Sequence, residues 1–402
     1  MESKDIPSKE KEREQLKLIS TDNKLKNLKS DYFIQKFFDN IHKRISLEII
    51  KYNKSIQKRI NININDYKEY SEKYSSIEIE IKPMENKYGS FINIKKEEEQ
   101  YYHIYYNDNK REEIKSTSLN EINRVSKINI ILDNQVESLC NLFKLCDCIE
   151  SICCKKCYRN NITDMSGLFY GCSSLKELNL NNLKTNNVTD MSGMFYGCSS
   201  LKELNLYNFN TNNVTNISCM FCECSSLIKL KLNNLNTNNV TDMSGLFVAC
   251  QSLNELNLSN FNTYNVTDMS GMFYGCLSLK ELNLNNFNTN KVTNMKHMFY
   301  ECSSLKELNL NNFITNNVTD MSSMFYSCSS LKELNLNNFI TNNVTHMNGM
   351  FYGCSSLKEL NLNNFNTNNV TDMEGMFSKC TDELKFKLKS KFNEFKEEAF
   401  ED

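Results

Sequence analysis

Residues 187–212 read NVTDMSGMFYGCSSLKELNLYNFNTN, and a unit of this kind recurs every 26 residues without insertion or deletion. Its methionine returns at Met165, Met191, Met243, Met269, Met295, Met321, Met347 and Met373, with Ile217 in the remaining place. Its cysteine returns at Cys172, Cys198, Cys224, Cys250, Cys276, Cys302, Cys328, Cys354 and Cys380. A fixed period in this range is typical of a solenoid, in which each coil buries its apolar side chains against its neighbours.

Two periodicities follow one another inside the unit. The apolar residues from Met191 to Cys198 stand at i, i+3, i+4 and i+7, which is the apolar stripe of a short helix. Asp190 precedes this stripe, and a carboxylate there can accept hydrogen bonds from the free N–H groups of a first helical turn. Leu204-Asn205-Leu206 then alternates apolar and polar residues as a strand does. We therefore predict one short helix and one short strand in each unit.

One asparagine is unbroken across eight units. It stands at Asn182, Asn208, Asn234, Asn260, Asn286, Asn312, Asn338 and Asn364. Buried backbone groups at a corner must find hydrogen-bond partners, and an amide side chain can bridge successive coils through its donor and its acceptor. We interpret this asparagine as a structural ladder and not as a binding site.

The repeat pattern V-T-D-M-S-x-M-F-x-x-C-x-x-L-x-x-L-x-L-x-x-F over residues 136–380 resembles the BspA-like class of leucine-rich repeat. The resemblance implies a right-handed solenoid that is used for binding, often at cell surfaces. The fold class that we expect is an α/β solenoid. It would be a leucine-rich-repeat superhelix of short parallel strands and short helices, preceded by a small α+β N-terminal region.

Composition and the start of the chain bear on the compartment. The formal net charge is −2, which does not indicate a nucleic-acid partner. No apolar run follows Met1, as a secretory signal requires, and no window is long and apolar enough to span a membrane. We therefore expect a cytoplasmic protein whose seventeen cysteines are reduced thiols. The Asn-Val-Thr sequons, such as the one at Asn187, are then turn residues and not glycan acceptors.

The N-terminal residues differ from the repeats. Residues 1–30 are predicted to be a charged flexible tail, and residues 31–70 show the spacing of two or three short helices. Residues 31–60 resemble an F-box, although the usual Leu-Pro opening is replaced by Asp31-Tyr32 and the chain has no tryptophan. The resemblance implies docking on a Skp-type ubiquitin-ligase adaptor through Phe33, Ile34, Phe37, Ile41, Leu47, Ile49 and Ile50.

Alternating runs such as SIEIEI (76–81) predict a small antiparallel β region over residues 71–124. The solenoid is predicted over residues 125–380, and the strand at 127–132 is expected to begin its sheet. Residues 381–402 leave the repeat and have apolar residues on one helical face. We expect this helix to cap the open end of the solenoid, with a docking helix for a partner as the alternative.

A cysteine cluster before the first regular unit has the spacing of a zinc site at Cys154 and Cys157. In the 26-residue register, however, these two cysteines take apolar core places, as does Cys146. We therefore read residues 136–161 as a degenerate first coil, with regular repeats from residue 162. Its remaining cysteines, Cys148 among them, are expected to lean outward.

The sequence contains no recognisable catalytic constellation. It has no glycine-rich phosphate loop and no nucleophile elbow, and His103 has no companion acid at a recognisable spacing. A ladder of acids, represented by Asp190, lacks the glycine-rich turns of calcium-binding repeats, so it is assigned to capping. We expect no enzyme activity, no cofactor and no metal.

The outward strand positions are the predicted partner-binding surface. Each unit presents Glu and Asn beside its buried leucines, and one unit breaks the row with lysines. The candidate residues are Glu203, Asn205, Tyr207, Lys229, Lys231, Glu255, Asn257, Glu281, Asn283, Glu307 and Asn309. Departures from the repeat concentrate in one region, where we place any specific contact: Tyr207, Cys219, Cys222, Lys229, Lys231, Val248 and Ala249. A uniform polar surface suits a repetitive ligand or weak multivalent contact.

Three functions remain open from the sequence. The first is a non-enzymatic module that binds a protein partner inside the cell. The second is an F-box-like substrate receptor of a ubiquitin ligase, in which residues 31–60 bind the adaptor. The third is an exported surface adhesion protein, which the repeat resemblance favours and the start of the chain opposes.

Overall fold

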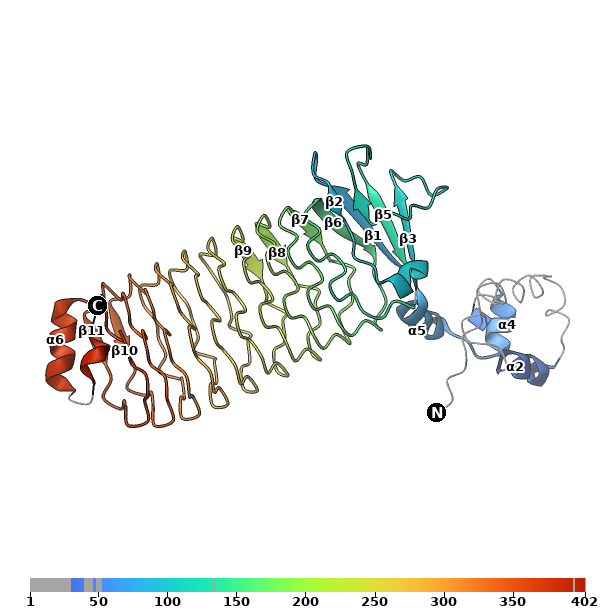
Figure 1. The fold of residues 1–402 in the computed structure, drawn as a ribbon. Coiled ribbons are helices and arrows are strands. Elements are labelled where there is room, and N and C mark those ends of the chain that lie inside the picture. Colours follow the sequence, from blue (N-terminus) through green and yellow to red (C-terminus); the bar gives the residue numbers. More distant parts are fainter. Residues whose placement is uncertain (1–29, 40–45, 48–52, 134, 393–394, 402) are drawn as a thin grey trace. The chain divides into compact units, whose positions relative to one another are not determined.

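The computed structural model describes residues 30–39, 46–47, 53–133, 135–392 and 395–401, which form two units, Met1–Ser75 and Ser76–Asp402 (Figure 1). The predicted flexible tail lies almost entirely outside the described residues. So do three of the residues assigned to adaptor binding, Ile41, Ile49 and Ile50.

The described part of the first unit is helical. It contains α2 (Asp31–Asp39), α4 (Lys54–Arg59) and α5 (Ile64–Tyr74). Ile34 and Phe38 on α2 pack against Ile56 and Ile60 in a small separate core. Asn53 fixes the start of α4, because its side chain accepts a hydrogen bond of 3.1 Å from the N–H of Ile56.

The second unit begins with a five-stranded sheet. Its strands are β1 (Ile77–Pro83), β3 (Tyr102–Tyr106), β5 (Ile128–Leu132), β6 (Ile149–Lys156) and β7 (Glu177–Asn179), in the order β3-β5-β1-β6-β7. Only the β6–β7 pair is parallel. The expectation that strand 127–132 begins the solenoid sheet is therefore wrong, because β1 lies between it and β6. The alternating isoleucines of β1 are buried, and its two edges pair with β5 and β6.

Short elements connect and cover this sheet. They are β2 (Gly89–Ser90), η1 (Lys96–Tyr101) and β4 (Ser118–Leu119), and β2 pairs with β4 antiparallel. Cys148, which was expected to lean outward, is buried. The β2 segment covers this side chain, and its thiol donates a hydrogen bond of 3.2 Å to the carbonyl of Ser90.

The repeats stack as parallel coils (Figure 1). β8 (Glu203–Asn205) pairs with β9 (Lys229–Lys231), and β10 (Glu333–Asn335) pairs with β11 (Glu359–Asn361). In both pairs, each residue faces the residue one repeat further along the chain. In the described coil around residues 281–283 no strand forms, although the alternation persists, with Leu282 buried between two exposed residues. The parallel solenoid is thus present, with strands in only part of its coils.

The stripe from Met191 to Cys198 is a run of turns and not a helix. The Met194 N–H donates to the Met191 carbonyl at 3.2 Å, but the Phe195 N–H donates to Met220 in the next coil at 2.9 Å. Gly193 has a φ of +57°, which is left-handed and outside a helix. Because alternate N–H groups bond between coils, they cannot form the i to i−4 bonds of a helix.

The acid at the start of the stripe accepts a backbone hydrogen bond, but it is not the helix N-cap that the sequence predicted. The Asp190 side chain accepts from the Ser192 N–H at 2.8 Å, and the equivalent bond forms at Asp242 with Ser244 at 2.9 Å. These are bonds to the residue two positions on, which is the Asx-turn pattern. The side chain therefore fixes a turn where the sequence predicted a helix start.

Identical side chains form continuous ladders in the core. Phenylalanines from Phe143 to Phe377 stack nearly parallel, with ring centroids 5.5 to 5.7 Å apart. All seventeen cysteines lie in the described residues, and none of them forms a disulfide. A ladder cysteine such as Cys198 is buried and donates to the carbonyl of Phe169 at 3.3 Å. The ladder cysteines are therefore core residues, as the register predicted.

The donor side of the asparagine ladder is confirmed, whereas the side-chain oxygens of Asn312 and Asn338 are buried without a hydrogen-bond partner among the described residues. The Asn312 amide donates to the carbonyls of Leu284 at 2.9 Å and Phe287 at 2.6 Å, both in the preceding coil. The other members likewise donate to the preceding coil, at Asn182, Asn208, Asn234, Asn260, Asn286, Asn338 and Asn364. This amide ties each corner to the next.

We expect Asn312→Ala to lower the free energy of unfolding by about 1–3 kcal/mol, because the Phe287 carbonyl loses its amide donor. Urea denaturation followed by circular dichroism measures the change. The control is Asn316→Ala at an exposed position of the same coil, where less than about 0.5 kcal/mol is expected. Equal effects of the two substitutions would contradict the ladder.

The segment after the last repeat closes the solenoid. Leu384 and Leu388 of α6 (Asp382–Lys391) are buried. Beyond it, η2 (Glu397–Ala399) takes the place of a further coil, since the Phe377 N–H donates to the Ala399 carbonyl at 2.7 Å. This segment therefore supplies both apolar cover and backbone partners to the last coil.

Candidate functional site

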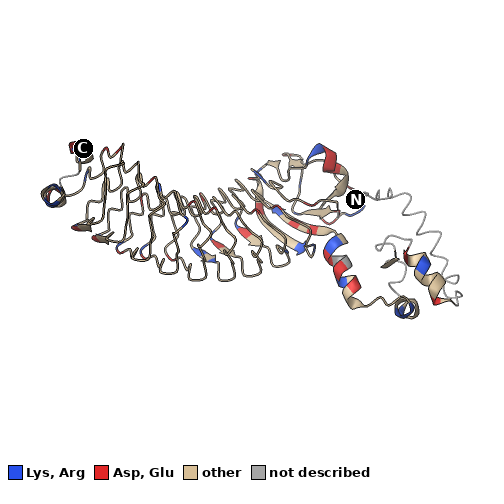
Figure 2. Cartoon of the chain, turned by 90° about the horizontal axis from the view of Figure 1, so that it is seen from below, with Lys and Arg blue, Asp and Glu red and all other residues tan. Residues whose placement is uncertain are grey.

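Exposed polar side chains form three columns along the strand side of the coils, which we call the strand face. In one coil Lys202, Glu203 and Asn205 are exposed beside buried Leu204. The lysine column continues at Lys280, Lys306, Lys332 and Lys358, and the glutamate column at Glu255, Glu281, Glu307, Glu333 and Glu359. Figure 2 marks these charges along the coils. The columns arise because residues 26 positions apart occupy the same place in successive coils.

Shallow hollows open on the strand face. One of about 630 Å³ has Leu282 and Leu308 in its floor, and Glu281, Asn283 and Lys306 are among the polar residues around it. Another lies at the C-terminal end, where Lys387 of α6 faces Glu359 and Leu360 of β11. Nothing in the local sequence pattern places α6 beside the strands, so its part in this surface was not predicted.

All eleven residues predicted to bind a partner are exposed on the strand face or beside it. Lys229 and Glu203 pair at 2.6 Å, and this hydrogen bond lowers the pKa of the Glu203 carboxyl. Both side chains are about two-thirds exposed, so solvent screens the pair and both remain available to a ligand. Tyr207 is 63 % exposed beside them.

The other departures from the repeat lie elsewhere. Cys219, Cys222, Val248 and Ala249 belong to the runs of turns, which have their own ladder of hydrogen bonds between coils. The sequence grouped them with Lys229 and its neighbours as one contact region. The structure separates the two sets, because strand and turns form different sides of each coil.

The cysteine pair and the acid ladder, whose spacing suggested metal binding, make hydrogen bonds within the fold instead. Cys154 is buried, and a hydrogen bond with Cys157 together with burial raises its pKa well above the ordinary value. Asp242 accepts from both the N–H and the hydroxyl of Ser244. Within the described residues there is no group of three or more His, Cys, Asp or Glu that could hold a metal ion.

His103 has acidic partners that the sequence did not reveal. Its Nδ1 lies 3.2 Å from a carboxylate oxygen of Glu113, and its Nε2 lies 3.5 Å from one of Asp133. The three residues come from β3, the loop after it and the end of β5, so no sequence spacing signals the cluster. Lys115 also pairs with Glu113, at 2.7 Å.

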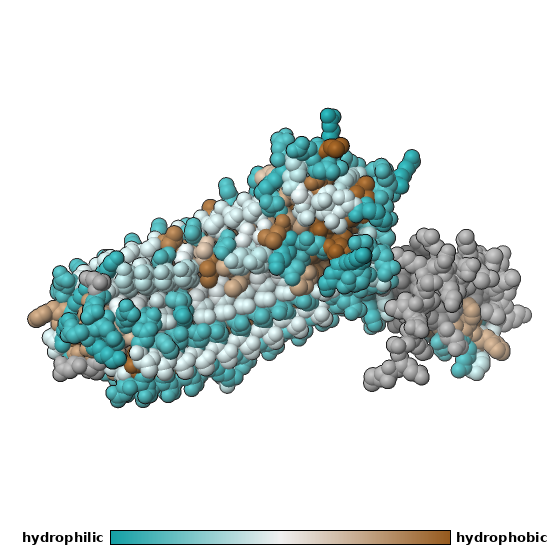
Figure 3. Space-filling view, in the orientation of Figure 1, coloured by the Kyte–Doolittle hydropathy of each residue, from teal (hydrophilic) through white to brown (hydrophobic). Residues whose placement is uncertain are grey.

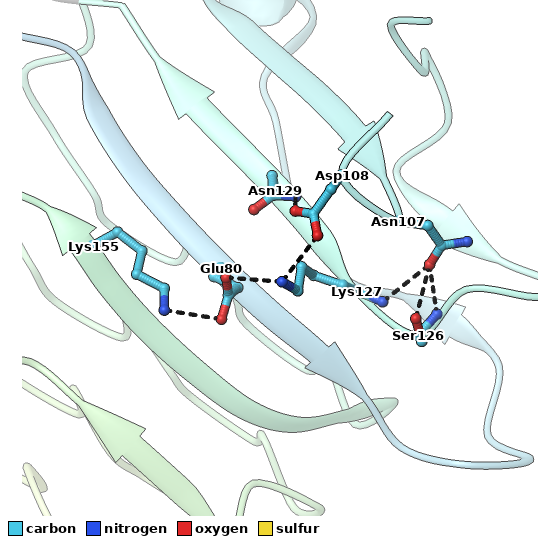
Figure 4. A network of polar contacts seen from close by, with 7 residues as sticks. All are labelled: Glu80, Asn107, Asp108, Ser126, Lys127, Asn129 and Lys155. Carbon is cyan, nitrogen blue, oxygen red and sulfur yellow. Dashed lines mark hydrogen bonds and ion pairs between the residues drawn. The ribbon is translucent and has the colours of Figure 1, made fainter. Parts of the chain in front are cut away.

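A second polar network lies on the N-terminal sheet (Figure 4). Glu80 on β1 pairs with Lys155 at 3.1 Å and with Lys127 at 3.5 Å, and Lys127 also pairs with Asp108 at 3.1 Å. Asn107 accepts from Ser126. These bonds hold the turn after β3 against β5 and β1, so we assign the network to the sheet's structure.

Hydropathy distinguishes the two parts of the second unit. Figure 3 shows a largely hydrophilic to neutral surface along the coils, with the larger hydrophobic areas over the N-terminal sheet. Across the described residues no helix is long and apolar enough to cross a membrane.

The stacked coils, core ladders and polar strand face define a repeat solenoid of parallel coils. Residues 137–231, 227–333 and 305–397 each match one family model, described as Mycoplasma protein of unknown function, DUF285. These matches together cover more than half of the chain, and the chain belongs to the DUF285 family.

Among solved structures, a leucine-rich repeat protein from Eubacterium ventriosum is similar at 15 % sequence identity and a TM-score of 0.30. The match covers 55 % of this chain and 63 % of that chain, so the chain spans less than two thirds of its length. No curated protein matches.

The F-box resemblance stays a prediction, because the family matches begin at residue 137. Of the residues assigned to adaptor binding, Phe33 is exposed and Phe37 is partly buried. Ile34 and Leu47 are buried and not available on the surface as described.

Proposed function

We propose that the chain is a non-enzymatic interaction module whose strand face binds a protein partner. The observation that carries this proposal is the set of exposed Lys, Glu and Asn columns above a floor of leucines, repeated in register over successive coils. Each coil offers the same donors, acceptors and charges, so a partner with an extended polar surface gains one set of contacts per coil.

The coil with Lys229 and Lys231 is the proposed point of specificity. It replaces the Glu and Asn of the other coils by two exposed lysines, next to Ile228, which is 45 % exposed. These three residues line one hollow together with Leu230 and Glu255. An acidic residue beside an apolar one on the partner would fit here, since charge complementarity sets register along an otherwise uniform surface.

Site-directed crosslinking in native cells tests the proposal. A photo-crosslinking residue at Asn283 or Asn309 is expected to capture the same protein, identified by mass spectrometry. Matched controls at Asn316 and Asn342, which are exposed in the turns after the strands, are expected not to capture it.

Charge reversal then tests the point of specificity. In the crosslinkable protein, Lys229→Glu combined with Lys231→Glu is expected to reduce capture at least about tenfold, since reversing two charges costs more than about 1.4 kcal/mol of binding. Capture at all four positions alike, or capture unchanged by the charge reversal, would refute a strand-face site.

A further inference from the structure

Two cysteines interrupt the surface pattern of the turns in one coil. Cys219 stands where Gly193 and Gly245 stand in the neighbouring coils, and Cys222 stands where Tyr196 does. We call these two residues the dithiol pair. Neither belongs to the cysteine ladder, whose member in this coil is Cys224.

The backbone brings the dithiol pair together. The Cys222 N–H donates to the Cys219 carbonyl at 3.1 Å, which closes a four-residue turn. The two Cα atoms of such a turn lie within about 7 Å, and disulfides bridge Cα separations of about 4.4–6.8 Å.

The two thiols differ in exposure. Cys219 is partly exposed and Cys222 is 4 % exposed. The sulfur of Cys219 lies over Gly245 of the next coil, where a Cβ would come within 2.9 Å of it. Because Gly245 has no side chain, it leaves room for this sulfur beside the next coil.

The ladder cysteine provides the contrast. The Cys224 thiol is buried and donates to the Phe195 carbonyl at 3.1 Å, and burial raises its pKa to about 12. The neighbouring Cys222 thiol lowers the pKa of Cys219 to about 7. A thiolate and not a thiol is the nucleophile, so Cys219 is the reactive member of this group.

We propose that Cys219 and Cys222 form a reversible disulfide, with hydrogen peroxide as the oxidant and Cys219 as the attacking group. The Cys219 thiolate attacks one peroxide oxygen, the O–O bond breaks, and hydroxide leaves to take up the proton that Cys219 had lost. The resulting sulfenic acid is attacked by Cys222. The S–O bond breaks, and the oxygen leaves as water with the Cys222 proton.

The net change is the two-electron oxidation of two thiols to one disulfide, with peroxide reduced to two waters. A dithiol reductant reverses it by thiol–disulfide exchange. The site lies in a gap of the tyrosine stack, since Tyr170 stacks on Tyr196 at 4.4 Å and the stack resumes at Tyr274 and Tyr300. The bridge can therefore form without displacing a stacked ring.

The test uses the reduced full-length chain, treated with hydrogen peroxide and then alkylated and digested. We expect the peptide that holds both residues to lose two hydrogen atoms and to recover them with dithiothreitol. Alkylation of Cys219 by iodoacetamide at pH 7 should be about threefold faster than that of a free cysteine peptide, because the larger thiolate fraction outweighs the lower nucleophilicity of a thiolate with a lowered pKa.

The repeat itself supplies variants that preserve the fold. Cys219→Gly restores the residue of the neighbouring coils and should abolish the disulfide. Cys222→Val copies Val248 and should leave a sulfenic acid on Cys219 that dimedone traps. The proposal is overturned if peroxide yields no bridge, if Cys219→Gly does not change the oxidation, or if the partly exposed Cys140 and Cys153 are oxidised as fast.

Discussion

Replacement of Phe325 by alanine is expected to lower the free energy of unfolding by about 3–5 kcal/mol. The ring is fully buried and stacks between Phe299 at 5.5 Å and Phe351 at 5.6 Å. Its loss leaves a cavity bordered by two coils at once. Because stability in a solenoid is carried by contacts between neighbouring coils, the coils beyond the cavity should also uncouple.

Guanidinium denaturation measures the total change, and hydrogen exchange locates it. We expect a second transition for the coils after residue 325 and faster exchange in them. The control is Tyr207→Ala, because that side chain is 63 % exposed and the expected change is below about 0.5 kcal/mol. A single transition shifted by less than 1 kcal/mol would refute the nearest-neighbour account.

Removal of residues 381–402 is expected to have the largest effect on solution behaviour. The deletion uncovers Phe377, on which Phe400 stacks at 5.1 Å, and removes the carbonyl of Ala399 that pairs with its N–H. An open solenoid end presents apolar side chains and unpaired backbone groups together. The truncated chain should therefore self-associate, as measured by light scattering after size-exclusion chromatography.

Two substitutions in α6 test whether its buried side chains stabilise the last coils, without removing any residue. Leu388→Ala removes a side chain that is 2 % exposed and should destabilise the last coils by about 2–5 kcal/mol. Phe386→Ala is the matched control, since that ring is 76 % exposed on the same helix. A monomeric truncated chain, or equal effects of the two substitutions, would show that α6 does not cap the solenoid.

The repeating part of the chain was largely predictable. Residues 26 positions apart in sequence are neighbours in space, so the fully buried ladders of Met, Phe and Cys follow directly from the period. The exposed columns on the strand face follow for the same reason. Even the partly buried corner amide of Asn312 could be assigned, because an unbroken polar residue in a stack of coils indicates a hydrogen bond to the neighbouring coil.

The local conformation of the stripe was not predictable from its spacing. Met191 to Cys198 satisfies the helical period, but the backbone bonds between coils at alternate residues. Gly193 and Gly197, with φ of +57° and +67°, were the only local signal against a helix. The period identifies which side chains face the core, and a run of turns buries the same side chains as a helix would.

The parts of the candidate sites that come from distant segments were also missed. Lys387 reaches the strand face only because α6 folds back along the last coil. The acids beside His103 are Glu113, in the loop after β3, and Asp133, directly after β5. Both arrangements depend on contacts between segments outside the repeat. The pattern of a single sequence does not indicate which of these segments lie together.

By itself, then, the sequence determined the solenoid, its period, the residues in its core and the columns on its surface, because every coil is packed against a copy of itself. The tertiary structure alone decided that β1 lies between β5 and β6, that the β2 segment buries Cys148, and that the stripe forms turns. Those features depend on contacts between unlike segments and on hydrogen bonds between coils, which periodicity does not encode.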